Sequence, residues 1–296
     1  MPALPDIIFI GFGEAATAFA KGWRGANLTP SIKAYDVKTD DAALKDAKLA
    51  DYKAQNVEGC VEAKAAITGA TIIFSMVTAD QAAEAAANTA QYIEQGQYYF
   101  DCNSCAPETK KTNAKLINAA GGRYVDVAVM APVYPKMHQV PLLICGEYAQ
   151  QAQDFFDKLD MKAEIVDGEI GQASSIKMVR SIMIKGLEAL NAECLLAARK
   201  LGIDETILTS LEKSFPEFGW HKRSGYMLER MMQHGVRRAA EMREVALTVA
   251  QLGLNNSMAK ATVEWQQLIG NMKLQAVGEE FETLSDQILD NMGDEK

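Results

Sequence analysis

Lys177 and the residues around it form the part of the chain best suited to acid–base chemistry. Ser174, Lys177, Ser181 and Lys185 follow one another at intervals of three or four residues, which places them on one face of a helix. Apolar residues occupy much of the rest of this helix, and a lysine that they shield from water carries a neutral amine more readily. Such an amine can take the proton of a substrate hydroxyl and return it in the reverse reaction. Spacing alone favours the other interpretation, in which both lysines extend their charged ends into water, and for Lys185 we keep it.

A glycine-rich turn between the first predicted strand and the helix after it is suited to holding a dinucleotide. It runs Gly11-Phe-Gly13-Glu-Ala-Ala16, a GxGxxA pattern after the apolar residues 7–10. Gly11 permits the tight turn, Gly13 lets the backbone approach a pyrophosphate, and Ala16 lets the helix pack closely on the strand. The helix N-terminus then offers N–H groups and a positive dipole to the phosphates. The alternative is a glycine turn that serves packing alone.

Asp36 ends the next predicted strand, about 25 residues after Gly11, where a carboxylate would accept hydrogen bonds from the adenosine ribose. A carboxylate there repels a 2′-phosphate, which favours NAD over NADP, although Lys38 could pair with that phosphate and weaken the preference. We therefore predict NAD as the cofactor, with NADP as the alternative. The residues predicted to contact it are Gly11, Phe12, Gly13, Glu14, Ala15, Asp36, Met76, Val77 and Asn103.

The elements that must position these residues change in kind near Gly168. Up to residue 167, strand-like segments (6–11, 31–36, 70–77, 98–101, 124–129 and 141–145) alternate with helical ones such as 15–23 and 82–93. This alternation predicts βαβ units in an α/β Rossmann domain, with a doubly wound and mostly parallel sheet. Residues 168–296 predict an all-helical domain, with helices over 174–201, 204–213, 224–232, 236–252 and 259–284 and a frayed tail over 290–296.

Composition excludes several classes of partner. The chain has 296 residues with 30 Lys+Arg against 39 Asp+Glu, a net charge of −9. Clustered positive charge is what nucleic acids and anionic membranes attract, so we expect neither as a partner. No apolar run reaches the roughly 18 residues of a membrane helix, and the first residues do not resemble a signal peptide, so we expect a cytoplasmic protein. Cys102 and Cys105 form a CxxC without a second metal-ligating pair, and we predict reduced thiols and no metal.

Taken together, these features resemble the β-hydroxyacid dehydrogenase superfamily, which includes 3-hydroxyisobutyrate and 6-phosphogluconate dehydrogenases. The chain looks closest to an uncharacterised 6-phosphogluconate-dehydrogenase-like branch, whose members also open with a GFGEAA turn. The segment Asp101-Cys-Asn-Ser104-Cys-Ala-Pro is similar to the family's D-x-S-T-x-x-P loop, which lines the nicotinamide and the substrate. Residues 168–181 look like the catalytic segment G-x-x-G-x-G-x-x-x-K-x-x-x-N, so that the family's lysine falls on Lys177 and its asparagine on Ser181.

Three departures from the family pattern concern the substrate. The family's D-A-P-V-S-G-G loop reads Asp126-Val-Ala-Val-Met130-Ala-Pro here, without the serine and glycines that grip a carboxylate. Ile184 stands where 6-phosphogluconate dehydrogenase has a glutamate acid, and a loose match puts Ala240 at the family's second-domain lysine. These differences argue against 6-phosphogluconate as the substrate.

The resemblance implies an NAD(P)-dependent oxidoreductase that transfers a hydride between the nicotinamide and a small hydroxy acid or sugar acid. Lys177 would be its general acid/base, at the carboxyl edge of the sheet between the two domains, and the helical domain would form a homodimer. An arginine pair on the helical domain would clamp a carboxylate or phosphate, unless it is a solvated helix face. Two alternatives stay open: a reductase of imines or bulkier carbonyls, and a protein that binds a dinucleotide without turnover. The residues predicted to contact the substrate are Ser104, Met130, Ser181, Arg237 and Arg238.

Overall fold

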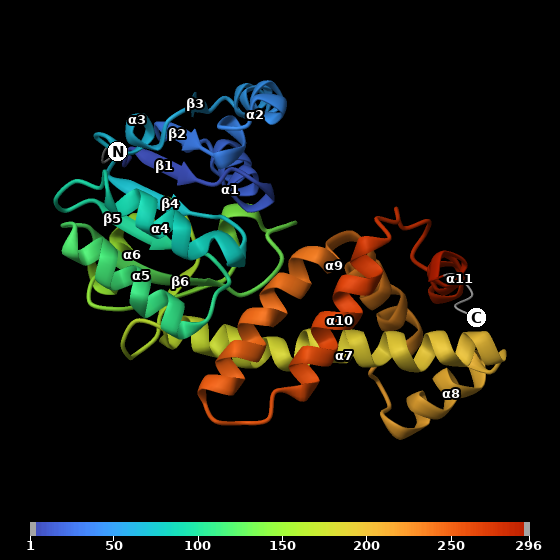
Figure 1. The fold of residues 1–296 in the computed structure, drawn as a ribbon. Helices are drawn as coiled ribbons and strands as arrows, with labels where there is room; N and C mark the ends of the chain where they lie inside the picture. The colour runs from blue at the N-terminus through green and yellow to red at the C-terminus, as the bar shows by residue number, and fades with distance from the viewer. Residues whose placement is uncertain (1–3, 293–296) are drawn as a thin grey trace. The chain divides into compact units, whose positions relative to one another are not determined.

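The chain folds into two compact units, Met1–Met178 and Val179–Lys296. The structure, a computed structural model, describes residues 4–292. The first unit is a sheet covered by helices, and the second consists of helices joined by loops, with no strand among its described residues (Figure 1). This architecture confirms the predicted Rossmann domain followed by an all-helical domain.

The sheet of the first unit has the strand order β3-β2-β1-β4-β5-β6-β7-β8. Among the described residues every neighbouring pair is parallel except β6 with β7. The chain leaves β1 towards β2 on one side and later returns to β4 on the other, and ligands of doubly wound folds bind at such a reversal. The strands are β1 (Ile7–Ile10), β2 (Ile32–Tyr35), β3 (Glu58–Cys60), β4 (Ile72–Ser75), β5 (Tyr98–Asp101), β6 (Arg123–Val129), β7 (Leu142–Cys145) and β8 (Ala163–Ile165).

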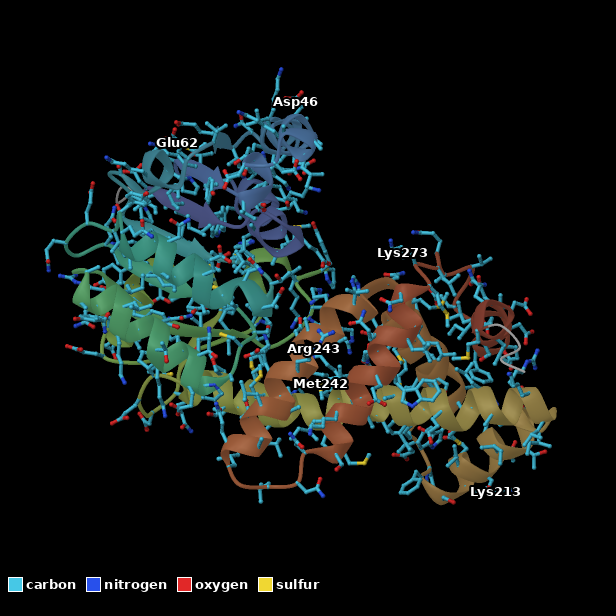
Figure 2. All side chains as sticks on the ribbon, in the orientation of Figure 1. Asp46, Glu62, Lys213, Met242, Arg243 and Lys273 are labelled. Atoms are coloured by element: carbon cyan, nitrogen blue, oxygen red, sulfur yellow. The ribbon has the colours of Figure 1, made fainter. Side chains whose placement is uncertain are left out.

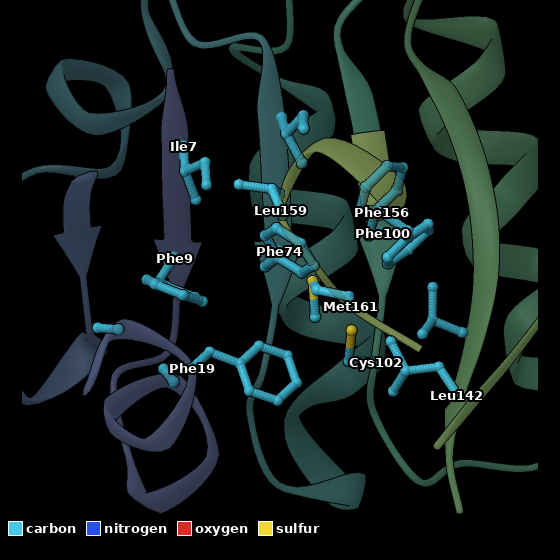
Figure 3. Close-up of a cluster of buried hydrophobic side chains, with 14 of the residues drawn as sticks. Ile7, Phe9, Phe19, Phe74, Phe100, Cys102, Leu142, Phe156, Leu159 and Met161 are labelled. Carbon is cyan, nitrogen blue, oxygen red and sulfur yellow. The ribbon is translucent and has the colours of Figure 1, made fainter. Parts of the chain in front are cut away.

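Both faces of the sheet are buried, because successive strand residues point to opposite faces and meet a different core on each side. Phe9 belongs to one core and Ile8 to the other. On the first face the Phe100 ring centroid lies 5.1 Å from that of Phe74 and 4.7 Å from that of Phe156 (Figure 3). This face is covered by α1 (Glu14–Gly25) and α6 (Ala149–Lys158), and the other by α3 (Ala63–Ile67), α4 (Ala82–Ala90) and α5 (Pro107–Ala119). The helix α2 (Ala42–Ala54) contributes Tyr52 to the first core.

The two edge strands that the sequence did not predict are three residues long. β3 reads Glu-Gly-Cys and β8 reads Ala-Glu-Ile, so neither has the apolar run that marks the central strands. Short strands at sheet edges need few apolar residues, because one side of each meets no neighbouring strand. The six strands that were predicted are confirmed within one or two residues at their ends.

The second unit consists of α8 (Asp204–Ser214), α9 (Trp220–Gln251), α10 (Ser257–Asn271), α11 (Phe281–Met292) and most of α7 (Gln172–Leu201), which begins in the first unit. Side chains on α9 divide between interior and surface, and Figure 2 labels two neighbours, Met242 and Arg243, that differ in this way. Met242 is fully buried, whereas the exposed Arg243 donates a hydrogen bond to Gln267 on α10. None of the described helices is long and apolar enough to cross a membrane.

The boundaries of three predicted helices in the second unit were wrong. Residues 224–232 and 236–252 belong to the single helix α9, because Gly235 does not break it. A Cβ at Gly235 would meet Gln266 O at 2.4 Å and the backbone of Gly270, so this glycine lets α9 and α10 approach closely. The predicted helix over 259–284 is instead α10 and α11, separated by a loop in which Lys273 and Gly278 have positive φ angles. Of the predicted frayed tail, residues 293–296 lie outside the described residues.

Candidate active site

The glycine turn after β1 has the backbone that a dinucleotide requires. Gly11 has φ +84°, and a Cβ there would meet Met76 O at 2.6 Å and Val77 Cγ1 at 2.7 Å, so only glycine fits. Gly13 is the N-cap of α1, and a Cβ there would have no heavy atom within 4 Å. Gly13 is exposed, whereas Ala16 is buried. The start of α1 is therefore accessible to a phosphate, whose oxygens the first N–H groups of a helix can bind.

Asp36 and Lys48 hold the middle residue of this turn from two sides. The Phe12 N–H donates to Asp36 Oδ2 at 2.9 Å, and Lys48 Nζ donates to the Phe12 carbonyl at 3.0 Å and to Asp51 at 2.9 Å. The Asp36 carboxylate thus stands beside the turn at the end of β2, with acceptor positions left for ribose hydroxyls. Lys48 was not predicted, because nothing in its local sequence separates it from a surface lysine on a helix.

Asn103 joins the ends of β4 and β5. Its Oδ1 accepts from the Val77 N–H at 2.7 Å, and its Nδ2 donates to Ser75 Oγ at 2.9 Å and to Asp101 Oδ1 at 2.8 Å. The residue is 3% exposed. Both amide N–H donors are therefore used within the protein, and Asn103 shapes the loop that a cofactor would meet.

Lys177 and Ser104 form a hydrogen-bonded pair of an amine and a hydroxyl, which is suited to proton transfer. Lys177 Nζ donates to Ser104 Oγ at 2.5 Å across 73 residues of sequence, and both side chains are half-buried. Ser104 lies in the loop between β5 and α5, and Lys177 lies in the second turn of α7. All of this lies within the first unit. The predicted catalytic residue and a predicted substrate contact are thus brought together.

Lys110 is a buried cation that the sequence did not single out. Its Nζ lies 3.0 Å from Asp101 Oδ1 and 3.3 Å from Asp126 Oδ1, and all three side chains are 0% exposed. Burial alone would lower the pKa of Lys110, but the two carboxylates outweigh it and raise that pKa above its usual value. A signal for this group was present in the sequence, since both aspartates stand on consecutive predicted strands, 98–101 and 124–129.

The other predicted contacts of the first unit differ in exposure. Glu14 is exposed and Ala15 half-buried at the first two positions of α1. Met130 packs against Ala128, Cys145 and Ala173, the last at the start of α7. The thiol of Cys102 is buried, which raises its pKa to about 12, and all five cysteines are free. No group of metal-ligating side chains occurs among residues 4–292.

In the second unit Ser181 lies beside a buried ion pair. Lys185 Nζ contacts Glu241 Oε2 at 2.8 Å and donates to Ser181 Oγ at 3.3 Å, and Arg237 donates to Glu241 Oε1 at 2.9 Å. Lys185 is only 5% exposed, so its expected extension into water is wrong. Glu241 on α9 supplies the partner that sequence spacing on α7 does not reveal.

Arg237 and Arg238 have different surroundings although they are adjacent. Arg238 is 8% exposed and directs Nε and Nη2 to Glu188, whose Oε2 also accepts from Gln266 at 2.9 Å. The Arg237 side chain is 43% exposed. Arg238 is thus engaged within the helical unit, and Arg237 is the more accessible of the two.

The family comparisons agree with this geometry. Residues 7–139 match the model of the NAD binding domain of 6-phosphogluconate dehydrogenase, and residues 198–269 match a domain of unknown function (DUF1932). A conserved hypothetical protein from Sinorhizobium meliloti 1021 is 35% identical, with 98% of this chain and 97% of that chain covered and a TM-score of 0.73. A second solved structure, a conserved protein of unknown function described as similar to 3-hydroxyacid dehydrogenases, is 25% identical, with 90% and 97% covered and a TM-score of 0.66.

A more distant structure shares the fold. The 3-hydroxyisobutyrate dehydrogenase of Mycobacterium tuberculosis is 13% identical, with 96% of this chain and 99% of that chain covered and a TM-score of 0.69. The match of residues 7–139 to the 6-phosphogluconate dehydrogenase model and the two relatives of 35% and 25% identity show that the chain belongs to the β-hydroxyacid dehydrogenase superfamily. Within it, the chain belongs to the uncharacterised 6-phosphogluconate-dehydrogenase-like branch, and in this chain the NAD-binding domain precedes the domain of unknown function.

Proposed function

We propose that the protein is an NAD-dependent oxidoreductase that interconverts the hydroxyl and carbonyl groups of a small hydroxy acid or sugar acid. The observation that carries this proposal is the 2.5 Å hydrogen bond between Lys177 Nζ and Ser104 Oγ in the same unit as the glycine turn. A catalytic amine must lie within hydrogen-bond reach of the group whose proton it moves, and Ser104 marks where a second hydroxyl can be held.

The proposed cofactor is NAD, held by the glycine turn and Asp36. The open start of α1 suits a pyrophosphate, and the Asp36 carboxylate suits ribose hydroxyls and repels a 2′-phosphate. The Phe12 N–H donates to Asp36 and the Phe12 carbonyl accepts from Lys48, and these bonds fix the position of the turn relative to the Asp36 carboxylate. Glu14, Ala15, Met76, Val77 and the loop at Asn103 complete the proposed cofactor contacts.

Lys177 moves the proton in the proposed reaction. The bound nicotinamide supplies hydride transfer to or from the substrate carbon. In the direction of oxidation, the neutral amine of Lys177 accepts the substrate hydroxyl proton; in reduction, the ammonium returns it to the carbonyl oxygen. A serine hydroxyl accepts and donates at once, so Ser104 can accept from Lys177 and donate to the substrate oxygen. Ser181, one turn further along α7, is the third polar group of this helix face.

An anionic substrate is proposed because α9 offers a partly exposed cation. Arg237 is partly exposed and pairs with Glu241, and a substrate carboxylate or phosphate could share its guanidinium. Arg238 contributes indirectly in this proposal, since Glu188 engages it. Met130 takes the place of the polar serine of the family's substrate loop and gives the substrate an apolar contact.

We further propose that the protein forms a homodimer through its helical unit. Apolar side chains remain exposed there, among them Met183 at 70%, Leu190 at 55% and Met258 at 65%. Exposed apolar surface of this kind is what an interface between copies would bury. Light scattering on the eluting protein should give twice the chain mass; a single chain mass at micromolar concentration would contradict the dimer.

The test of the proposed function is a substrate screen combined with one substitution. Hydroxy acids, sugar acids and imines are each incubated with NAD or NADP, and the absorbance of the reduced nicotinamide is followed. Lys177→Ala should lower turnover of the best substrate by roughly 10²–10⁴-fold while NADH binding, followed by fluorescence, stays within a few fold. Lys115→Ala, an exposed lysine on α5, is the matched control. Unchanged turnover in Lys177→Ala contradicts the assignment, and imine-only activity favours the reductase alternative.

A further inference from the structure

Two aspartates face each other at the ends of neighbouring strands in the first unit. Asp101 ends β5, and its register partner on the parallel strand β6 is Asp126. Both side chains are 0% exposed. Like charges directly opposite on paired strands repel each other, and burial strengthens that repulsion by removing water. The arrangement therefore requires a cation between the two carboxylates.

Lys110 supplies that cation from the second turn of α5. Its Nζ contacts one oxygen of each carboxylate, at 3.0 Å and 3.3 Å, and donates to the Asp101 carbonyl at 2.6 Å. The carboxylates raise the pKa of Lys110 although burial opposes them, so the side chain stays charged at every pH at which the protein would work. One cation thus fixes the spacing of two strand ends.

Each carboxylate also accepts hydrogen bonds from a different segment of the candidate site, besides those from Tyr124 to Asp101 and from Cys145 to Asp126. Asp101 Oδ1 accepts from the Asn103 N–H at 3.0 Å, immediately before Ser104. Asp126 accepts from the Gly171 N–H at 3.1 Å, the Ser174 N–H at 3.2 Å and the Ser174 hydroxyl at 2.7 Å. The Asp101 side therefore holds the loop that carries Ser104, and the Asp126 side holds the start of the helix that carries Lys177.

We propose that Lys110 is a positioning residue that sets the separation of Ser104 and Lys177 through Asp101 and Asp126. Lys110 does not contact the reacting atoms; it acts through the two carboxylates and the segments that they bind. The positioning of the two segments rests on these hydrogen bonds and ion pairs alone, and only its consequence for turnover rests on the proposed function.

The test uses two pairs of variants of the full-length protein. Lys110→Met removes the cation, and its control is Lys111→Met, an exposed neighbour paired with Glu108. Since two buried aspartates without a cation can prevent folding, the second pair is milder. Ser174→Ala removes one hydrogen bond to Asp126, and its control is Ser175→Ala, whose hydroxyl donates to the carbonyl of Gly171, just before α7, and not to Asp126.

The readouts do not need a substrate. The first is the pH dependence of the rate at which Lys177 is acylated by a small reagent, measured by peptide mass spectrometry. The second is amide hydrogen exchange over residues 103–104 and 171–174. We expect Ser174→Ala to change the Lys177 acylation rate at pH 8 at least threefold and to speed exchange over 171–174 at least tenfold. Lys110→Met should do the same for both segments, and the two controls should match the native protein.

The outcomes separate this proposal from the proposed function. Unchanged acylation profile and exchange in a folded Ser174→Ala variant overturn the positioning role, even if Lys177→Ala abolishes turnover. Equal changes in Ser175→Ala overturn it too, since they would mean that any loss of a hydroxyl on this turn perturbs Lys177. Altered acylation in Ser174→Ala together with full turnover in Lys177→Ala would support the positioning and contradict the catalytic assignment of Lys177.

Discussion

Each unit of the molecule buries a cluster of charged side chains, and the two clusters serve different ends. The strand-end cluster (Asp101, Lys110 and Asp126) sets one cation between two carboxylates, all 0% exposed. The helix cluster (Lys185, Glu188, Arg238 and Glu241) pairs each cation with its own carboxylate, at side-chain exposures from 5% to 12%. In the strand-end cluster, carboxylate oxygens also accept hydrogen bonds from backbone N–H groups outside the cluster. In the helix cluster, the charged side chains pair with one another and join α7 to α9.

The strand-end cluster organises the candidate site, whereas the helix cluster contributes to the stability of the second unit. Carboxylates that accept from Asn103, Gly171 and Ser174 determine where two segments of backbone lie. Side chains that pair across two helices determine how firmly the helices are joined. A buried ion pair adds little net stability, but removal of one partner leaves an uncompensated charge and is costly. The two clusters should therefore respond alike in stability and differently in chemistry.

The largest expected effect compares the two lysines on α7. Lys177→Ala should lower turnover by roughly 10²–10⁴-fold at nearly native stability, because it removes the proton-transfer group. Lys185→Ala should keep turnover within about tenfold and lower stability by roughly 1–3 kcal/mol, because Glu241 loses a buried partner. Steady-state kinetics and urea unfolding of both variants measure the contrast. A greater loss of turnover in Lys185→Ala than in Lys177→Ala would contradict the assignment of proton transfer to Lys177.

The next effect concerns the stability of the second unit. Arg238→Met leaves Glu188 buried without its guanidinium and should destabilise the protein by about 3–5 kcal/mol. Arg237→Met, at a 43% exposed side chain, should cost less than about 1 kcal/mol. Urea unfolding at pH 7.5 measures both. Equal losses of stability in the two variants would show that the buried Glu188 carboxylate does not need the Arg238 guanidinium. The interpretation of the helix cluster as paired charges would then be wrong.

A smaller effect concerns the glycine turn. Asp36→Asn keeps a hydrogen-bond acceptor for the Phe12 N–H but removes the charge that repels a 2′-phosphate. The preference for NAD over NADP, measured as the ratio of dissociation constants, should fall by roughly tenfold, equivalent to about 1.4 kcal/mol. Asp40→Asn, which loses its charge beside Tyr35 in the same region, is the control. An unchanged ratio in Asp36→Asn would remove the charge argument for NAD.

The smallest effect is a pH dependence in the second unit. Burial and the nearby Arg230, Arg237 and Arg238 lower the pKa of His234 from 6.5 to about 4. The unfolded chain therefore takes up a proton near pH 6.5 that the folded chain refuses until about pH 4. Stability is fully present above pH 6.5 and falls between those values, by about 1 kcal/mol at pH 5 once solvent screening of this half-buried side chain is allowed for.

The measurement is urea unfolding of two histidine variants at pH 8 and pH 5. His234→Gln should lose less stability over this range than the native protein. His221→Gln, an exposed histidine that contacts Glu205 at 3.1 Å, should lose as much as the native protein does. If both variants behave as the native protein, His234 does not carry the acid sensitivity.

Local pattern was sufficient for much of the fold and part of the site. The apolar runs located the six central strands, and Gly11, Gly13 and Asp36 located the turn beside the end of β2. Helix boundaries in the second unit failed where a glycine had a tertiary role. Gly235 lies between the two helices predicted over 224–232 and 236–252. In the structure it is the point where α9 crosses α10 closely, opposite Gly270, and the sequence near Gly235 does not reveal this contact.

The sequence by itself determined which chemical groups are present and the local structure that carries each: a glycine turn, a polar loop and a lysine-bearing helix, because those patterns depend on neighbouring residues. Only the tertiary structure decided which charges meet. Lys110 and Lys185 look like surface lysines in sequence, and each is buried because carboxylates from distant segments offset the loss of water. The pairing of Lys177 with Ser104 spans 73 residues and likewise follows from the packing of α7 against the strand ends.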